Sequence, residues 1–282
     1  MEILDFTQAQ VDQCIPKRAA DTNKNHYGRV WAFCGSVGYT GAAYFAAQGA
    51  VRMGSGIVTL AVPQEIYPVM AVKLNEPVIQ TYTEHNWREV LGQASRAAAC
   101  LIGPGLGHFS AFRELTLTAL ETLSIPLVLD ADGINALAGH IDTLCSTTQP
   151  VVLTPHLGEF ARLTGLQNPT AEQLEAFAVQ HNCVLLLKGH RTLIASPDGR
   201  VTRNMTGNPG MAKGGSGDVL AGMIVSLLGQ GLSPADAARV GAHLHGSVGN
   251  LCANRLSEYG MTPTDMLEVL PHVLHKYNTR EW

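Results

Sequence analysis

Residues 204–228 read Asn204-Met-Thr-Gly-Asn-Pro-Gly-Met-Ala-Lys-Gly-Gly-Ser-Gly-Asp218-Val-Leu-Ala-Gly-Met-Ile-Val-Ser-Leu-Leu228. Glycine lets the backbone take conformations closed to other residues and lets a ligand approach the main chain closely. A helix that begins near Gly217 would direct its unpaired N–H groups and the positive end of its dipole at the loop before it. The loop is therefore predicted to be an anion hole for a phosphate or a developing oxyanion. Its members are Gly214, Gly215, Ser216 and Gly217.

Asp218 ends this loop and falls in the first turn of the expected helix. A carboxylate in that position can simply stabilise the start of a helix. A helix cap, however, does not require the glycines that precede it. We therefore favour a second role, in which Asp218 is a catalytic carboxylate beside the anion hole.

The bulk composition is that of an ordinary globular protein of 282 residues, with a net charge of −4. This length suits one large α/β domain or two small ones. No cluster of Lys and Arg stands out in the sequence. We therefore expect no binding to nucleic acid and none to an anionic membrane. Small anionic ligands stay possible, because backbone amides can bind them.

The cysteines and the N-terminal segment indicate the compartment. Six cysteines are far apart and form no C-x-x-C pair, so neither a zinc site nor a disulfide framework is expected, and we expect buried thiols in a reducing compartment. Residues 1–7 are acidic where a signal peptide needs a basic region. The best candidate for a membrane span, residues 42–62, is interrupted by Gln48 and Arg52. A cytoplasmic location is expected.

Strand and helix patterns alternate from about residue 29, which predicts an α/β fold with a mostly parallel central sheet and helices on both faces. An Ala-rich helix is expected over residues 42–53, and helices fill the chain after Val219. The expected buried strands are Val30–Cys34, Ile57–Val62, Cys100–Ile102, Leu127–Ala131, Val151–Thr154 and Val184–Lys188.

Two further strands, 192–196 and 200–203, are joined by the turn 197–199 and are predicted to form a hairpin at the edge of the sheet. Nothing in the sequence marks a linker or repeat, so residues 26–282 are assigned to one domain. Residues 1–25 are expected to be an N-terminal extension that packs on this domain or on a neighbouring subunit.

Ligands of open α/β sheets bind beyond the carboxyl ends of the strands. The segments that follow the expected strands are rich in glycine and polar residues: Gly35–Ala42, Gly103–Gly107, Asp130–Asn135, Thr154–Glu159 and Lys188–Thr192.

Each of these segments also has a plain structural interpretation. The glycines from Gly35 to Gly41 do not fit the dinucleotide-binding G-x-G-x-x-G, and no P-loop motif is present. Asp132 suits a helix cap as well as a function, and His156 alone is more typical of a cap. Lys213 suits a phosphate contact or a solvated loop equally. At least one of His243 and His245 is expected in the core.

Taken together and in this order, these segments closely resemble the ADP/ATP-dependent NAD(P)H-hydrate dehydratases, from about residue 26 to the C-terminal helices. The resemblance implies a ribokinase-like three-layer sandwich. It also implies removal of water from the S epimer of the damaged cofactor NADHX or NADPHX, driven by a nucleotide phosphate. Bacterial-type members convert ADP to AMP and phosphate, whereas eukaryotic-type members use ATP. Many bacterial members carry an N-terminal epimerase, for which this chain has no room, so a stand-alone dehydratase that cooperates with a separate epimerase is expected.

The family's site residues carry over to matching positions of this sequence. Asp218 is implied as the catalytic base that also touches the hydrate. The hydrate would further contact Ala42, Gly105 and His156, and the adenine nucleotide would be held by Lys188, Gly189, His190, Arg191, Thr192 and Gly217. The resemblance implies a homotetramer. Mg²⁺ is expected to be held mainly through the nucleotide, because no acidic cluster indicates a metal site in the protein.

Two other functions stay open. A ribokinase-like small-molecule kinase, of the hydroxyethylthiazole or hydroxymethylpyrimidine type, would use the same anion hole and Asp218. The segments Thr154–His156 and Gly103–Gly107 favour the dehydratase. A nucleotide-binding regulatory module without catalysis is less consistent with an intact glycine loop that ends in Asp218.

Overall fold

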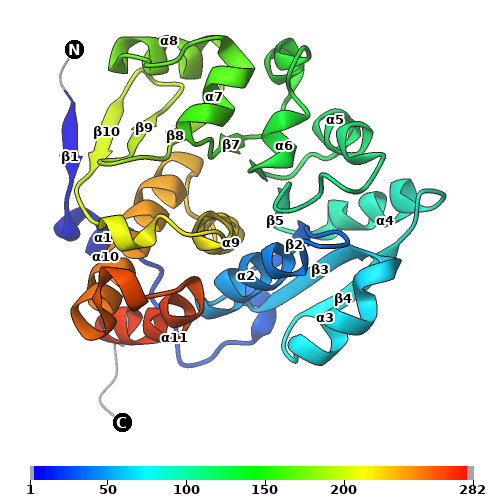
Figure 1. The fold of residues 1–282 in the computed structure, drawn as a ribbon, viewed down its shortest axis with the longest axis horizontal. Helices are drawn as coiled ribbons and strands as arrows, with labels where there is room; N and C mark the ends of the chain where they lie inside the picture. The colour runs from blue at the N-terminus through cyan, green and yellow to red at the C-terminus, as the bar shows by residue number, and fades with distance from the viewer. Residues whose placement is uncertain (1–2, 278–282) are drawn as a thin grey trace.

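A ten-stranded sheet forms the centre of the molecule, in the order β1-β10-β9-β8-β7-β6-β5-β2-β3-β4 (Figure 1). The computed structural model describes residues 3–277. Within that range β9 runs antiparallel to β8 and β10, and every other pairing of strands is parallel. The strands are β1 (Leu4–Phe6), β2 (Arg29–Phe33), β3 (Ile57–Pro63), β4 (Val78–Tyr82), β5 (Ala99–Ile102), β6 (Leu127–Leu129), β7 (Val151–Leu153), β8 (Val184–Leu187), β9 (Leu193–Ala195) and β10 (Val201–Asn204).

Helices cover both faces of this sheet. The α-helices are α1 (Gln8–Cys14), α2 (Thr40–Arg52), α3 (Tyr67–Lys73), α4 (Trp87–Gln93), α5 (Phe112–Thr122), α6 (Asp132–Asn135), α7 (Leu157–Thr164), α8 (Ala171–Gln180), α9 (Ser216–Gly229), α10 (Pro234–Gly260) and α11 (Pro263–Leu274). Short 3₁₀ helices are η1 (Lys24–Tyr27), η2 (Gln64–Ile66), η3 (Ala94–Arg96), η4 (Ile141–Ser146), η5 (Pro209–Met211) and η6 (His275–Tyr277).

Alternate side chains of each strand enter different cores, as the pleat of a strand requires. In β2, Val30 and Ala32 join the core beneath α2, α9, α10 and α11. Trp31 and Phe33 join the core beneath α4, α5, α7 and α8. These two cores on either side of one sheet make the three-layer sandwich that was predicted.

The N-terminal segment supplies the edge of the sheet. β1 pairs in parallel with β10, from Leu4 opposite Thr202 to Phe6 opposite Asn204. The predicted hairpin of β9 and β10 is present, but it does not lie at the edge, because β1 covers it. The helix α1 packs on α10 of the same chain.

The predicted strands agree with the observed ones, with small differences at their ends. β6, β7 and β8 stop at Leu129, Leu153 and Leu187. Asp130, Thr154 and Lys188 therefore stand just beyond the strands rather than within them. β4 was not predicted, because its burial is partial and its pattern is weak.

The six cysteines are all free thiols, as expected. The prediction that all of them are buried is wrong for two: Cys145 is exposed and Cys14 is only partly buried. Among residues 3–277, no helix combines the length and the apolar character that crossing a membrane demands.

Candidate functional site

The strand order reverses between β2 and β5, and ligands of open α/β sheets bind beyond the carboxyl ends of the strands at such a point. The loops that leave these two strands are bonded to each other. The Gly35 N–H donates to the Pro104 carbonyl at 2.7 Å. The Ser36 hydroxyl donates to the Gly105 carbonyl at 2.7 Å. Two loops that are far apart in sequence thus form one wall of the site.

Ala42 and Gly105, both predicted to contact the hydrate, lie against each other in this wall. Gly105 has a φ of 68°, and a Cβ on it would come within 2.8 Å of the Ala42 Cβ. A side chain larger than hydrogen at residue 105 would therefore collide with the start of α2. The predicted pair is brought together, and both residues are small because the loops meet so closely.

The helix α9 begins inside the glycine loop, as predicted. Its N-cap is Gly215, with a φ of 99°, and a Cβ there would come within 2.7 Å of the Phe45 ring. Ser216 N–H already donates to the Lys213 carbonyl at 3.2 Å. The first N–H groups of a helix have no partner within it, so Gly217 and Asp218 are the ones left to bind an anion.

Ser216, a predicted member of the anion hole, has both its N–H and its hydroxyl engaged within the protein. The side chain is buried, and Oγ lies 3.3 Å from Nε2 of His245 on α10. The same ring nitrogen lies 2.9 Å from the Ser216 carbonyl oxygen. Burial lowers the pKa of His245 to about 4, so the ring is neutral at physiological pH. His245 therefore anchors the first turn of α9.

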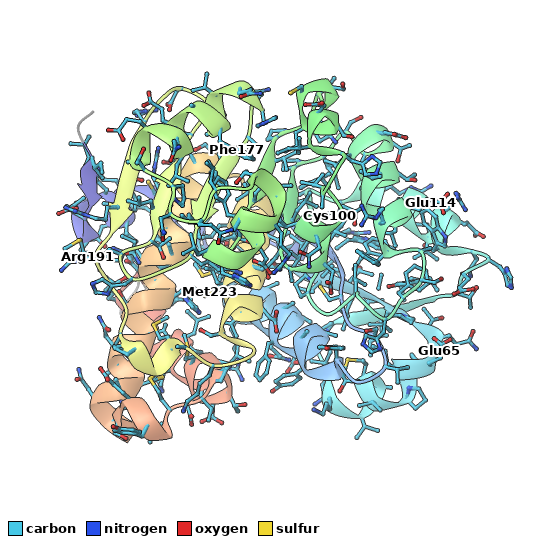
Figure 2. All side chains as sticks on the ribbon, turned by 45° about the horizontal axis from the view of Figure 1, so that its top comes forward. Glu65, Cys100, Glu114, Phe177, Arg191 and Met223 are labelled. Carbon is cyan, nitrogen blue, oxygen red and sulfur yellow. The ribbon has the colours of Figure 1, made fainter. Side chains whose placement is uncertain are left out.

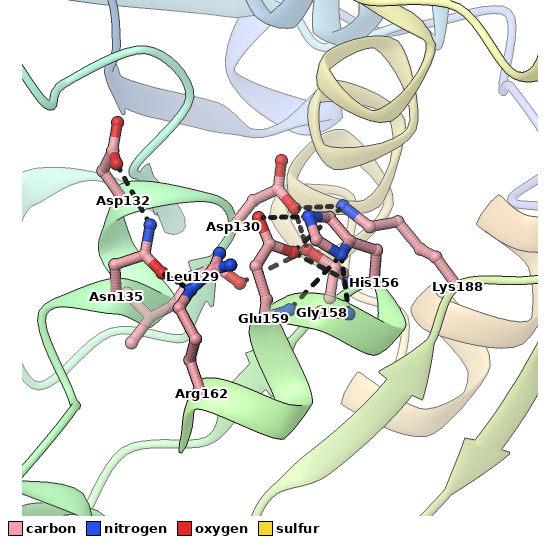
Figure 3. A network of polar contacts seen from close by, with 10 residues as sticks. Leu129, Asp130, Asp132, Asn135, His156, Gly158, Glu159, Arg162 and Lys188 are labelled. Carbon is pink, nitrogen blue, oxygen red and sulfur yellow. Dashed lines mark hydrogen bonds and ion pairs between the residues drawn. The ribbon is translucent and has the colours of Figure 1, made fainter. Parts of the chain in front are cut away.

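Lys188 is the positive charge of the site, and two carboxylates hold it in place (Figure 3). Nζ lies 2.7 Å from Asp130 Oδ1 and 3.9 Å from Glu159 Oε2. Thr154 Oγ1 donates to the same oxygen of Asp130 at 2.8 Å. Burial opposes the charge on Lys188, but Asp130 and Glu159 outweigh it and raise the pKa of the ammonium. Sequence reasoning named both carboxylates only as neighbours of strand ends and did not foresee this pairing.

Lys188 also lies beside the anion hole. A Cβ built on Gly217 would come within 3.3 Å of Nζ. Lys188 comes from the end of β8, and Gly217 comes from the first turn of α9. The amide groups and the ammonium therefore face a common space that suits a phosphate.

Asp218 follows Gly217 in the first turn of α9, and the pKa of its carboxyl is unusually high for an aspartate. Burial raises the pKa of its carboxyl to about 7, Asp130 and Glu159 add to the rise, and Lys188 opposes it. A carboxyl with a pKa near 7 can take up and release a proton at neutral pH, which is the property of a general base. This property cannot be read from sequence, because it depends on Asp130, which is 88 positions away (218 − 130).

His156 has the cap geometry that its sequence context indicated. Nδ1 accepts from the N–H groups of Gly158 and Glu159, and Glu159 accepts from the His156 N–H in return. Nε2 lies on the other side of the ring, and 53% of the side chain is exposed. A backbone bridge joins His156 to Lys188. His156 thus caps α7, and the exposed part of its ring is still available for contact with a ligand near Lys188.

The predicted nucleotide segment, residues 188–192, is the turn between β8 and β9. Gly189 N–H donates to Thr192 Oγ1 at 3.4 Å, and Thr192 Oγ1 donates to the Gly189 carbonyl at 3.2 Å. His190 and Arg191 are exposed, and Arg191 is labelled in Figure 2. The turn is next to the predicted anion hole, because its first residue, Lys188, lies beside Gly217.

Asp132 and Lys213 take structural positions. The Gly107 N–H donates to Asp132 Oδ2 at 2.8 Å, which ties the loop after β5 to the start of α6. Lys213 Nζ donates to the Tyr259 carbonyl at 2.7 Å and to the Met261 carbonyl. Both His243 and His245 are buried, in keeping with the expected core position.

A cavity of about 600 Å³ lies elsewhere, and its lining contains none of the predicted site residues. It is bordered by Arg52, Leu227 and Leu274, near the C-terminal ends of α2, α9 and α11. These helix ends lie at the amino ends of the strands. The predicted site residues, which follow the carboxyl ends of the strands, therefore lie at the opposite edge of the sheet from this cavity.

Comparison with known proteins identifies the family. The family model described as NAD(P)H-hydrate dehydratase matches residues 30–272. The chain belongs to this family. That range includes every strand exit described above. It confirms the resemblance on which the site residues were chosen.

Individual relatives agree with this assignment. The chain is 42% identical to a bifunctional NAD(P)H-hydrate repair enzyme of Moorella thermoacetica, over 95% of this chain and 53% of that protein. It thus spans about half the length of this curated relative. It is 34% identical to the ADP-dependent (S)-NAD(P)H-hydrate dehydratase of Bacillus subtilis, over 98% of this chain and 100% of that one.

Solved structures confirm the fold. The ADP/ATP-dependent NAD(P)H-hydrate dehydratase of Bacillus subtilis, co-crystallised with ATP and Mg²⁺, superimposes with a TM-score of 0.87 at 32% identity, over 99% of this chain and 100% of that one. Ribokinase of Thermotoga maritima gives a TM-score of 0.56 at 11% identity, over 88% of this chain and 99% of that one. The latter likeness shows the ribokinase-like fold alone.

Proposed function

We propose that this protein dehydrates the S epimer of NADHX or NADPHX to NADH or NADPH while ADP is converted to AMP and phosphate. The observation that carries the proposal is the position of Asp218, whose pKa is raised to about 7, at an open helix N-terminus beside Lys188. The names of the relatives in Bacillus subtilis support this substrate and this donor.

The proposed reaction begins with phosphorylation of the hydrate hydroxyl, because hydroxide is a poor leaving group. Asp218 removes the hydroxyl proton as the oxygen attacks the terminal phosphorus of ADP, and the bond from that phosphorus to AMP breaks. The N–H groups of Gly217 and Asp218, with Lys188, stabilise charge on the phosphoryl oxygens. Phosphate then leaves, driven by the lone pair of the ring nitrogen, and loss of a proton from the adjacent ring carbon restores the dihydronicotinamide.

The predicted contacts follow the same geometry. The turn 188–192 and Gly217 would hold the nucleotide at the anion hole. Ala42 and Gly105 would contact the hydrate where the loops after β2 and β5 meet. His156, which is bridged to Lys188 through the backbone, would contact it as well. The hydrate and the phosphate would then meet at Asp218.

Mg²⁺ fits this site as an ion carried by the nucleotide. Mg²⁺ commonly takes one or two carboxylates together with substrate phosphates and water. Asp130 and Glu159 are the carboxylates beside Lys188, and they are already engaged by its ammonium. Bound in this way, the ion would neutralise charge on the phosphate oxygens.

The decisive experiment is to incubate the purified protein with NADHX and Mg²⁺, to add ADP or ATP, and to follow the recovery of reduced-nicotinamide absorbance. Recovery with ADP, together with AMP and phosphate, is expected. No recovery with either nucleotide, on substrate that contains the S epimer, would overturn the proposal. A stable phosphorylated product would identify a ribokinase-like kinase, and binding without any turnover would identify a regulatory module.

We further propose that the enzyme works as a homotetramer in the cytoplasm and cooperates with a separate NAD(P)HX epimerase. The resemblance supports these points. The Moorella relative is named as bifunctional and the match covers 53% of it, which supports the cooperation alone. Light scattering of the purified protein tests the assembly. Addition of an NAD(P)HX epimerase to a reaction on mixed epimers tests the cooperation, because conversion should then proceed beyond the S fraction.

A further inference from the structure

A second group of chemically reactive side chains lies outside the site described above. Asp142 and Cys145 belong to η4, and His181 follows the last residue of α8. One donor atom from each of the three lies within 4.8 Å of the other two. Within residues 3–277, this is the one set of three or more His, Cys, Asp or Glu side chains with such spacing.

The local backbone brings the three residues together. In a 3₁₀ helix, residues three apart lie one above the other, so Asp142 and Cys145 share one side of η4. His181 is the C-cap of α8, and its N–H donates to the Phe177 carbonyl at 3.0 Å. Its ring packs on the Phe177 ring with centroids 4.6 Å apart, and the residue is only 5% exposed. The imidazole is therefore held in one orientation.

The separation of the two strongest ligands matches a tetrahedral metal ion. Cys145 Sγ lies 3.5 Å from His181 Nδ1. Zinc binds thiolate sulfur at about 2.3 Å and imidazole nitrogen at about 2.0–2.1 Å, and a tetrahedral angle then places the two ligands about 3.5 Å apart. The carboxylate of Asp142 is exposed, and one of its oxygens lies within 4.8 Å of both other donor atoms.

We propose that Asp142, Cys145 and His181 form a zinc site that binds one ion per chain, with water in the fourth position. One thiolate, one imidazole and one carboxylate are ligands that Zn²⁺ accepts, whereas Mg²⁺ and Ca²⁺ prefer oxygen ligands alone. Cys145 and Asp142 are exposed, so an ion can enter directly from solvent.

The site lies at the opposite edge of the sheet from the catalytic residues. η4 precedes β7, and α8 precedes β8, so both are near the amino ends of parallel strands. An ion there joins η4 to the end of α8, through ligands that are 36 and 39 positions apart in the chain (181 − 145, 181 − 142). Since a ligand that binds only the folded chain stabilises it, zinc should raise the unfolding temperature, and the rise should grow with the logarithm of free zinc once this exceeds the Kd.

A titration with Co²⁺, followed by competition with Zn²⁺, tests the proposal on chain stripped of metal. Co²⁺ bound to a thiolate gives a charge-transfer band that reports the sulfur ligand directly. In the unsubstituted protein one equivalent of Co²⁺ should saturate this band, and one equivalent of Zn²⁺ should remove it. Cys145→Ser should abolish the band, and Asp142→Asn should weaken Zn²⁺ affinity by at least about tenfold.

Cys14→Ser is the matched control, because Cys14 is another partly accessible thiol and lies in α1. It should keep the band and the zinc-dependent rise in unfolding temperature. Absence of the band in the unsubstituted protein, or its persistence in Cys145→Ser, would overturn the proposal. The metal-free Cys145→Ser protein should unfold at the same temperature as the metal-free unsubstituted protein, since Cys145 is exposed.

Discussion

At the scale of single residues, the site depends on the carboxyl of Asp218, whose pKa is affected by two other carboxylates, Asp130 and Glu159. Burial, together with the charges of Asp130 and Glu159, raises the pKa of Asp218 to about 7. Lys188 counteracts this rise and is itself held by both neighbours. The four side chains form one electrostatic unit, so a change in one alters the proton affinity of another.

Asp218→Asn should lower kcat by about 10²–10⁴-fold, because the base that accepts the hydroxyl proton is removed. Nucleotide should still bind, since the amide groups of α9 and the turn 188–192 are unchanged. Steady-state kinetics and calorimetric titration with ADP provide the two measurements. Near-normal turnover would exclude the proposed role.

The pH dependence follows from the direction of the Asp218 shift. In the proposed mechanism the active form of Asp218 is the ionised carboxylate, and burial raises its pKa to about 7. kcat/KM should therefore rise as pH increases through about 7 and become constant above it. If kcat/KM instead rose near pH 4, where an ordinary aspartate ionises, the raised pKa of Asp218 would be contradicted.

Asp130→Asn should move that rise in kcat/KM to lower pH. Its negative charge raises the pKa of Asp218, and its loss also leaves the charge of Lys188 less compensated, so both effects favour the ionised carboxylate. Asp132→Asn is the matched control, because Asp132 bonds to the Gly107 amide and contributes nothing to the Asp218 shift. An unchanged pH dependence in Asp130→Asn would show that the two carboxylates do not interact.

Sequence reasoning could find these residues but not their interactions. Asp130, His156 and Lys188 were all visible as polar residues after strands. The ion pair of Lys188 with Asp130 joins residues 58 positions apart and depends on the order of β6, β7 and β8. Likewise, Asp142 and His181 show no metal-binding spacing, and only the fold brings them together.

At the scale of elements, the start of α9 controls where the anion hole points. Gly215 has a left-handed φ and packs against the Phe45 ring. His245 holds the next residue from the side of α10. The first turn of α9 is thus fixed by contacts from α2 and α10, and its amide groups are preorganised.

Gly215→Ala should disturb this turn. The left-handed conformation costs an L-residue roughly 1–2 kcal/mol, and the added Cβ also meets Phe45. A displacement of the amides by about 1 Å costs about 10²-fold in rate. Gly92→Ala in α4 is the control, because Gly92 is not a site residue, its φ is not positive and an added Cβ there has no neighbour within 4 Å. Turnover and thermal unfolding of both variants should separate them; equal behaviour would contradict the argument.

Elements were predictable where most side chains are buried. The strands β2, β3 and β5 to β8 are mostly apolar and mostly buried, and all were found near their observed bounds. β1 and β4 lie at the two edges of the sheet, where fewer side chains are buried and the pattern is correspondingly weak. The edge of the sheet was wrongly assigned to the hairpin of β9 and β10, because edge position depends on pairing rather than on local sequence.

At the scale of the whole molecule, β1 completes the sheet and anchors the N-terminal segment. Phe6 is 5% exposed, and Leu4 is 51% exposed. Phe6→Ala should lower the free energy of unfolding by about 3–5 kcal/mol, because a buried aromatic ring is removed. Leu4→Ala should change it far less. Denaturant unfolding of the two variants provides the measurement, and equal losses would show that β1 is not anchored through its buried residue.

The pairing of Leu4 with Thr202 joins residues 198 positions apart in the chain (202 − 4). Contacts across so long a loop form late, because the entropy of closing the loop opposes them. At about 5–20 residues per second, a ribosome needs on the order of 10–40 s to make the intervening chain. Throughout that interval Phe6 has no β10 against which to pack. The first strand of this chain to be synthesised is therefore among the last to find its place in the sheet.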